Sequence, residues 1–268
     1  MDREETAGLM GLYGASLALA TVACVSAIAA AVPPAATPAI SGELRDVLAA
    51  AANRERGAQL FAICANCHGK RGEGNASGWP PEIAGQHPRV IAKELTDFRA
   101  GLRWYDPMQR IAGRHVLHTA QEIADISAYV GSLVPSGATS TGPGRWVERG
   151  AGLYVARCQS CHGVQGEGSD LRFVPRVAAQ QYEYLLRQLR DTVSGQRPNM
   201  LPPHRQLLET LGADELVGMA DYMSRLGRGV HRTATAAASG ASEAVVSRAP
   251  TAPPTPALRP ARAPAARG

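Results

Sequence analysis

The chain has 268 residues, of which 45% are apolar and only 5% aromatic, and its formal net charge is +5. This length allows one or two domains, and the composition excludes collagen, coiled coils and wholesale disorder. Four of the five net positive charges lie after residue 229, where five arginines face one glutamate. The remainder therefore lacks the charge excess of a nucleic-acid-binding face, and we expect no nucleic-acid partner. Because aromatic side chains usually dominate burial, their scarcity favours a bulky cofactor as a filler of the core.

Residues 1–42 have the composition of a membrane-targeting segment. No charged residue occurs from Ala7 to Gly42, and residues 7–32 are almost continuously apolar. The run is long enough to span a bilayer as a retained anchor, whereas its alanine-rich end would suit a cleaved signal peptide. We expect the anchor, with the signal peptide as the alternative, and we expect Cys24 to be an apolar residue of the run rather than a lipidation site.

The segment between the two ends contains an internal repeat. The hexapeptide CANCHG at Cys64 recurs as CQSCHG at Cys158, and the same offset of 94 residues aligns later positions. These later matches include Pro81 with Pro175, Gln86 with Gln180 and Asp97 with Asp191. Two copies indicate a tandem duplication rather than a solenoid. The predicted organisation is a first domain at 53–134, a linker at 135–145, a second domain at 146–227 and a disordered Ala/Pro/Arg-rich tail at 228–268.

Each half shows apolar residues at helical spacing in three segments. The predicted helices cover residues 54–65, 89–100 and 120–133 in the first half and 146–160, 182–194 and 213–226 in the second. Thr119 and Glu122 have the spacing of a capping box at the start of the third helix. No stretch alternates as a strand would, so the predicted class is all-α, with long loops that need a filler.

The two C-x-x-C-H motifs carry the chemistry. Two cysteines three positions apart and a following histidine fit on one helical turn, so they can address the same object. This is the attachment motif of c-type haem: the cysteines hold the macrocycle by thioethers and the histidine binds the iron. The predicted residues are Cys64, Cys67 and His68 for the first haem and Cys158, Cys161 and His162 for the second. The alternatives are a zinc site or a redox dithiol, but no second cysteine pair exists to complete a cysteine-rich zinc site.

The sixth iron ligand decides the function, because methionine raises the potential and suits electron transfer. Met108 is the only methionine of the first half, and Met200 stands at nearly the repeated position in the second. We predict these two as axial ligands. Met219 and Met223 are spaced as core residues of a helix. The histidines His87, His115, His118 and His204 do not repeat between the halves, so we expect them to be surface or supporting residues.

Residues 53–227 resemble a dihaem class I cytochrome c of the cytochrome c4 type. The resemblance rests on the two haem motifs followed by Gly-Glu-Gly, on IAGQ at 83–86 echoed by VAAQ at 177–180, on LTDFRAG at 95–101 and on DPM at 106–108. It implies two tandem domains, each wrapped around one covalent haem. It also implies that the Pro81 and Pro175 carbonyls accept a hydrogen bond from the haem histidines. The helix crossings would lie at Gly57, Phe61 and Tyr129 and at Gly150, Tyr154 and Tyr222.

These observations predict a one-electron carrier rather than an enzyme, with no catalytic residues. We expect it on the periplasmic side of a bacterial inner membrane, tethered by its N-terminal segment or soluble if that segment is cleaved. Its partners would be a quinol-linked or dehydrogenase donor and an oxidase or second cytochrome as acceptor. One alternative is an electron-accepting subunit of a membrane-bound dehydrogenase. The other is a dihaem peroxidase-type or sulfur-oxidising enzyme, which two methionine ligands would disfavour.

Overall fold

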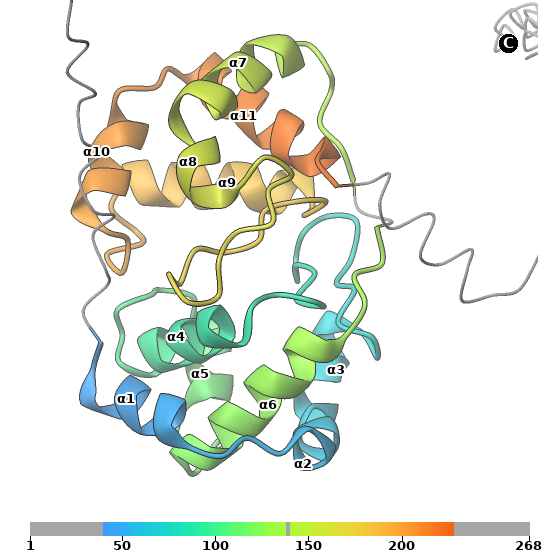
Figure 1. Ribbon diagram of the computed structural model, residues 1–268, viewed down its shortest axis with the longest axis vertical. Coiled ribbons are helices and arrows are strands. Elements are labelled where there is room, and N and C mark those ends of the chain that lie inside the picture. The colour runs from blue at the N-terminus through green and yellow to red at the C-terminus, as the bar shows by residue number, and fades with distance from the viewer. Residues whose placement is uncertain (1–39, 138–139, 228–268) are drawn as a thin grey trace, which may run out of the picture. The chain divides into compact units, whose positions relative to one another are not determined.

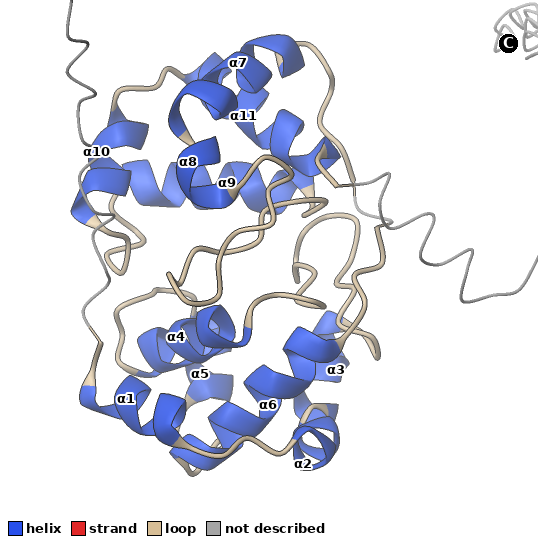
Figure 2. Ribbon diagram, viewed as in Figure 1, coloured by secondary structure: helices blue, strands red, loops and turns tan. Residues whose placement is uncertain are grey.

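The computed structural model describes residues 40–137 and 140–227, which form helices joined by long loops, with no strand among them (Figures 1 and 2). The first half contains α1 (Gly42–Ala49), α2 (Arg54–Leu60), α3 (Ala62–His68), α4 (Pro88–Arg99), α5 (Asp106–Ala112) and α6 (Ala120–Ser132). The second half contains α7 (Val147–Arg157), α8 (Gln159–His162), α9 (Tyr182–Val193), α10 (Pro202–Glu209) and α11 (Ala213–Arg225). The all-α prediction is confirmed for the described residues.

The predicted helices all exist, with boundaries that shift by a few residues. The first prediction, 54–65, is split at Phe61 into α2 and α3, and the capping box at Thr119 and Glu122 is formed at the start of α6. Three short helices, α1, α5 and α10, were not predicted. Two of these, α5 and α10, begin with proline in the first turn, where its missing N–H costs nothing.

The first half is held together where α2 crosses α6. Gly57 allows this approach, because a Cβ there would lie 2.6 Å from the Asp125 carbonyl carbon. Next to the crossing, the rings of Phe61 and Tyr129 pack with centroids 5.2 Å apart. Asp125 is fully buried, accepts the Asn53 N–H at 2.7 Å and pairs with Arg56. The crossing is therefore fixed by one absent side chain, one aromatic pair and one buried carboxylate.

The second half repeats this crossing between α7 and α11. A Cβ on Gly150 would lie 2.8 Å from the Met219 backbone nitrogen, and the rings of Tyr154 and Tyr222 lie 5.4 Å apart. The buried carboxylate here is Asp221, which accepts from Arg225 at 2.7 Å. The contacts expected from the cytochrome resemblance are thus present at both crossings.

Helix α1 belongs to the core of the first half, although it precedes the predicted boundary at residue 53. Ser41 caps it by accepting the Leu44 N–H at 3.1 Å, and Leu44 and Val47 are buried in the first core. The described residues of both halves lie in one compact unit.

Paired glutamines join the two halves. Gln86 donates to the Arg176 carbonyl and accepts the Arg176 N–H, both at 2.9 Å. Gln180 donates to the Glu82 carbonyl at 2.8 Å. Gln86 and Gln180 occupy the same position of the repeat, and so do Glu82 and Arg176. In each half, the glutamine therefore contacts the backbone of the equivalent residue in the other half. The repeat therefore generates a pseudo-twofold pair of contacts.

The predicted membrane-targeting segment and the C-terminal tail lie outside the described residues. Within the described ranges, no helix combines the length and the apolar character that crossing a membrane requires.

Candidate functional site

The first motif lies on α3, which ends at His68. Gly69 stops the helix in a left-handed conformation, with φ of +81°. His68 is buried, and its Nδ1 lies 2.8 Å from the Pro81 carbonyl oxygen. Burial lowers the pKa of His68, and the contact with Pro81 opposes this effect. The imidazole is therefore neutral at pH 7, with Nδ1 as donor to Pro81 and Nε2 as the nitrogen left for a metal.

A cavity of about 360 Å³ opens beside this motif. Cys64, Cys67 and His68 line it from α3, and Met108 lines it from α5. Apolar side chains form most of the remaining wall, among them Leu95, Phe98, Ile126 and Val130. Burial raises the pKa of the Cys64 thiol to about 11. The arrangement places two sulfurs, an imidazole and a thioether around one apolar space.

The residues around this cavity fit a haem. Its apolar walls suit a flat hydrophobic macrocycle, and its lining also includes the charged side chains of Arg103 and Arg197. Arg197 Nε is buried and makes no hydrogen bond within the described part of the chain. Such an unpaired donor is costly unless a bound acceptor satisfies it, and the carboxylates of a haem are acceptors of this kind.

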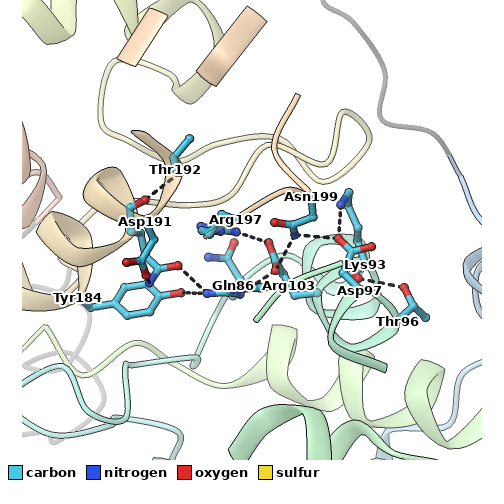
Figure 3. A network of polar contacts seen from close by, with 12 residues as sticks. Gln86, Lys93, Thr96, Asp97, Arg103, Tyr184, Asp191, Thr192, Arg197 and Asn199 are labelled. Carbon is cyan, nitrogen blue, oxygen red and sulfur yellow. Dashed lines mark hydrogen bonds and ion pairs between the residues drawn. The ribbon is translucent and has the colours of Figure 1, made fainter. Parts of the chain in front are cut away.

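A buried network of charges lines part of this cavity (Figure 3). Glu94 accepts from Arg103 at 2.7 Å and from Arg197 at 2.8 Å. Although burial acts to raise the pKa of Glu94, the two guanidinium groups hold it at about 2. Arg103 also donates to the Tyr184 hydroxyl at 2.9 Å and to Gln188 Oε1 at 2.7 Å. Charges from both halves therefore meet at the first cavity.

The second motif is arranged in the same way. Cys158 precedes α8 and packs against the second core, with its Sγ 3.7 Å from Met219 Sδ. His162 ends α8, and its Nδ1 lies 3.1 Å from the Pro175 carbonyl oxygen. Burial lowers the pKa of His162. The two motifs therefore present equivalent sulfur and nitrogen atoms, each with the proline contact that the resemblance implies.

Met200 and His204 lie on different segments of the second half. Met200 follows a turn, with its N–H 3.2 Å from the Arg197 carbonyl oxygen. His204 lies on α10, and its ring centroid is 6.3 Å from that of His162. Burial, with His162 and Arg197 nearby, lowers the pKa of His204 to about 4. The sequence predicts a surface or supporting role for His204, because no histidine stands at the repeated position of the first half. The dipeptide Pro203-His204, which parallels Pro107-Met108, is the sequence feature that could have indicated its place near the second motif.

The described residues contain no ligand cluster for a zinc site, which was the alternative to haem. Across residues 40–137 and 140–227, no three His, Cys, Asp or Glu side chains gather as a metal-binding group. Cys64, Cys67, Cys158 and Cys161 are all free thiols in the structure. Both sites thus offer the donor set of a covalent haem.

The fold and the two motifs define a c-type cytochrome with two haem-binding domains. Residues 54–134 match the cytochrome c family, and residues 146–223 match the family of cbb3-type cytochrome c oxidase subunit III. A cytochrome c4 from Azotobacter vinelandii is 31% identical, over 56% of this chain and 77% of the relative. The reduced cytochrome c4 of Pseudomonas stutzeri superposes with a TM-score of 0.57 at 26% identity, over 66% of this chain and all of that one. The chain belongs to the cytochrome c4 family.

Family membership confirms the two covalent c-type haems and the role of a dihaem electron-transfer cytochrome. A further relative is named thiosulfate dehydrogenase electron acceptor, from Stutzerimonas stutzeri. It is 30% identical over 62% of this chain and 79% of its own length.

Proposed function

We propose that this cytochrome carries single electrons between protein partners on the periplasmic side of the membrane. The observation that supports it best is the first cavity, where Cys64, Cys67 and His68 face the same space as Met108. A haem bound there supplies reversible one-electron chemistry of its iron. His68 and Met108 would fill both axial positions, which leaves no open coordination site for a substrate.

The side chains around the iron ligands set the conditions for this role. The Pro81 and Pro175 carbonyls orient the imidazoles of His68 and His162 and fix their protonated nitrogen. Cys64, Cys67, Cys158 and Cys161 would form the thioethers. The apolar wall of the cavity excludes water, and such surroundings favour the less charged reduced state and raise the potential.

The periplasmic location and the N-terminal tether are part of the proposal. Covalent attachment prevents haem loss outside the cytoplasm, and the apolar run at residues 7–32 is suited to export or anchoring. Cell fractionation with N-terminal sequencing of the mature protein tests both points. Recovery of the haem-loaded chain from the cytoplasm would contradict the location, and a cleaved N-terminus in the soluble fraction would contradict the tether.

A second candidate is an electron-accepting subunit of a dehydrogenase, such as a thiosulfate or other sulfur-compound dehydrogenase. It is favoured by the relative named as a thiosulfate dehydrogenase electron acceptor. The two roles differ in whether the chain is a fixed subunit, so co-purification of the chain with a dehydrogenase in one stable complex that reduces it rapidly would support the second. Isolation of the chain by itself, with electron transfer from a separate donor to an oxidase or second cytochrome, would support the first.

Haem content and electron count test the proposed function directly. The full chain should carry two haems and take up two electrons. Cys64→Ser with Cys67→Ser should leave one covalent haem, whereas the control Cys24→Ser should leave two. Reduced protein should not bind carbon monoxide, because no axial position is open. A chain that binds zinc in place of haem, or turns over peroxide, would contradict the carrier.

A further inference from the structure

The helices α5 and α10 occupy equivalent places in the two halves. Each follows the 12-residue helix of its half, and each packs against it, α5 on α4 and α10 on α9 (Figure 1). Helix α5 begins Asp106-Pro107-Met108, and α10 begins Pro202-Pro203-His204. The third position of the helix is therefore Met108 in the first half and His204 in the second. The equivalent helix starts therefore place a histidine, not Met200, at the position that corresponds to Met108, the predicted ligand of the first half.

The segment before α10 is drawn toward the first half. Arg197 donates to Glu94 at 2.8 Å, and Asn199 donates to Asp97 at 2.8 Å (Figure 3). Met200 comes directly after these two anchored residues. Among the described residues, the apolar side chains packed against the second core do not include Met200, whereas Met108 does pack against the first core. Met200 therefore lacks the core contact that Met108 has.

The spacing of His162 and His204 matches two ligands of one metal ion. Their ring centroids lie 6.3 Å apart, with planes inclined at 57°. A metal–imidazole nitrogen bond is about 2.0 Å long, and in a five-membered ring with bonds of about 1.33 Å each atom lies about 1.1 Å from the centre. Two imidazoles on opposite sides of one ion therefore have centroids about 6.2 Å apart, close to the 6.3 Å found here. The inclination is allowed, because each ring can turn about the axis through the ion.

The same two rings do not bond to each other. At this separation, facing nitrogens are about 4 Å apart, beyond hydrogen-bond reach. His162 already uses Nδ1 for the Pro175 carbonyl, and His204 Nδ1 is buried without a hydrogen-bond partner in the described chain. Ordinary edge contact of two aromatic rings also allows this distance, but it does not explain a buried unpaired nitrogen at the position of Met108.

We propose that His204 is the sixth ligand of the second haem iron, in place of the Met200 that the sequence predicts. This inference rests on the proposed function, since it requires a haem bound through His162. The first site then has histidine and methionine ligands and the second has two histidines. Because methionine raises the potential relative to histidine, the second haem has the lower potential. Electrons entering at the second domain would run downhill to the first.

The test is near-infrared absorption and magnetic circular dichroism of the full haem-loaded chain, which detect the sulfur-to-iron band of methionine ligation. We expect a band from one haem of two, low-spin iron at both, and no band in Met108→Leu. Met200→Leu should leave the spectrum unchanged. His204→Met should add a second sulfur band and raise the lower of the two potentials. The control His118→Met, at an exposed histidine of the first half, should do neither.

The outcomes separate this inference from the proposed function. Sulfur bands from both haems, one of them lost in Met200→Leu, would overturn the inference and leave the electron carrier intact. A five-coordinate second haem in the wild type would also overturn it. Fewer than two haems per chain would instead contradict the proposed function. If His204→Met fails to fold, the wild type, Met108→Leu and Met200→Leu still decide between the two ligands.

Discussion

Gly150→Ala should destabilise the second half by closing the space in which α7 and α11 cross. The added Cβ would lie 2.8 Å from the Met219 backbone nitrogen and closer still to the Gly218 carbonyl. Ordinary carbon contacts are about 3.5–4.0 Å, so the helices must separate by roughly 1 Å. Such overpacking costs about 1–3 kcal/mol, and alanine returns about 0.8–1.0 kcal/mol as a better helix former. Because rigid backbone opposes the methyl group, we expect a net loss of about 2 kcal/mol.

Gly152→Ala is the matched control, two residues further along the same helix. Its Cβ would meet nothing within 4 Å, so only the helix propensity changes, and we expect a gain of up to about 1 kcal/mol. The assay is chemical denaturation of the haem-loaded chain, followed by far-ultraviolet circular dichroism. If Gly150→Ala unfolds at the same denaturant concentration as Gly152→Ala, the close crossing does not limit stability and the reasoning fails.

Three further predictions concern the polar contacts. Glu94→Gln leaves two buried guanidinium groups without their carboxylate and should lower the free energy of unfolding by about 3–5 kcal/mol in chemical denaturation. The control Glu209→Gln, in an exposed pair, should lower it by no more than about 1 kcal/mol. Equal losses would contradict the buried network. The pKa of Glu94 is held at about 2, below its unfolded value of about 4.3. The contribution of Glu94 to the free energy of unfolding is therefore complete above a pH of about 4.3 and is lost as the pH falls toward 2. The wild type should lose stability in this window more steeply than Glu94→Gln. Parallel acid titrations of the two would refute the assignment. Gln180→Leu leaves the buried Glu82 carbonyl without its donor and should lower the free energy of unfolding by about 1–3 kcal/mol. The control Gln206→Leu, at an exposed glutamine, should change it little. An unchanged stability of Gln180→Leu would show that this contact does not stabilise the interface between the halves.

Local patterns in the sequence predicted the long helices because each spans three or more turns of one apolar stripe. The 12 residues of α4 and the 13 of α6 give the helical period room to repeat. Helices α1, α5 and α10 have only seven or eight residues. At two turns, a helical period is hard to tell from a loop, and in water such segments are stable only when packed. Leu44 and Leu208 show this packing, since each is buried in the core of its half.

The sequence alone predicts the chemistry of attachment, because the cysteines and histidine of each motif are neighbours on one helical turn and their spacing brings them together. It also determined the duplication, through the shared offset of 94 residues. The side chains that face the motifs from distant parts of the chain could be found only from the folded arrangement. The partners of Glu94 come from residues 103 and 197, and His204 faces His162 across 42 positions of chain. Such contacts depend on how helices and loops pack in three dimensions. A fixed offset along the sequence also stops matching equivalent residues of the two halves once a loop has gained or lost two residues.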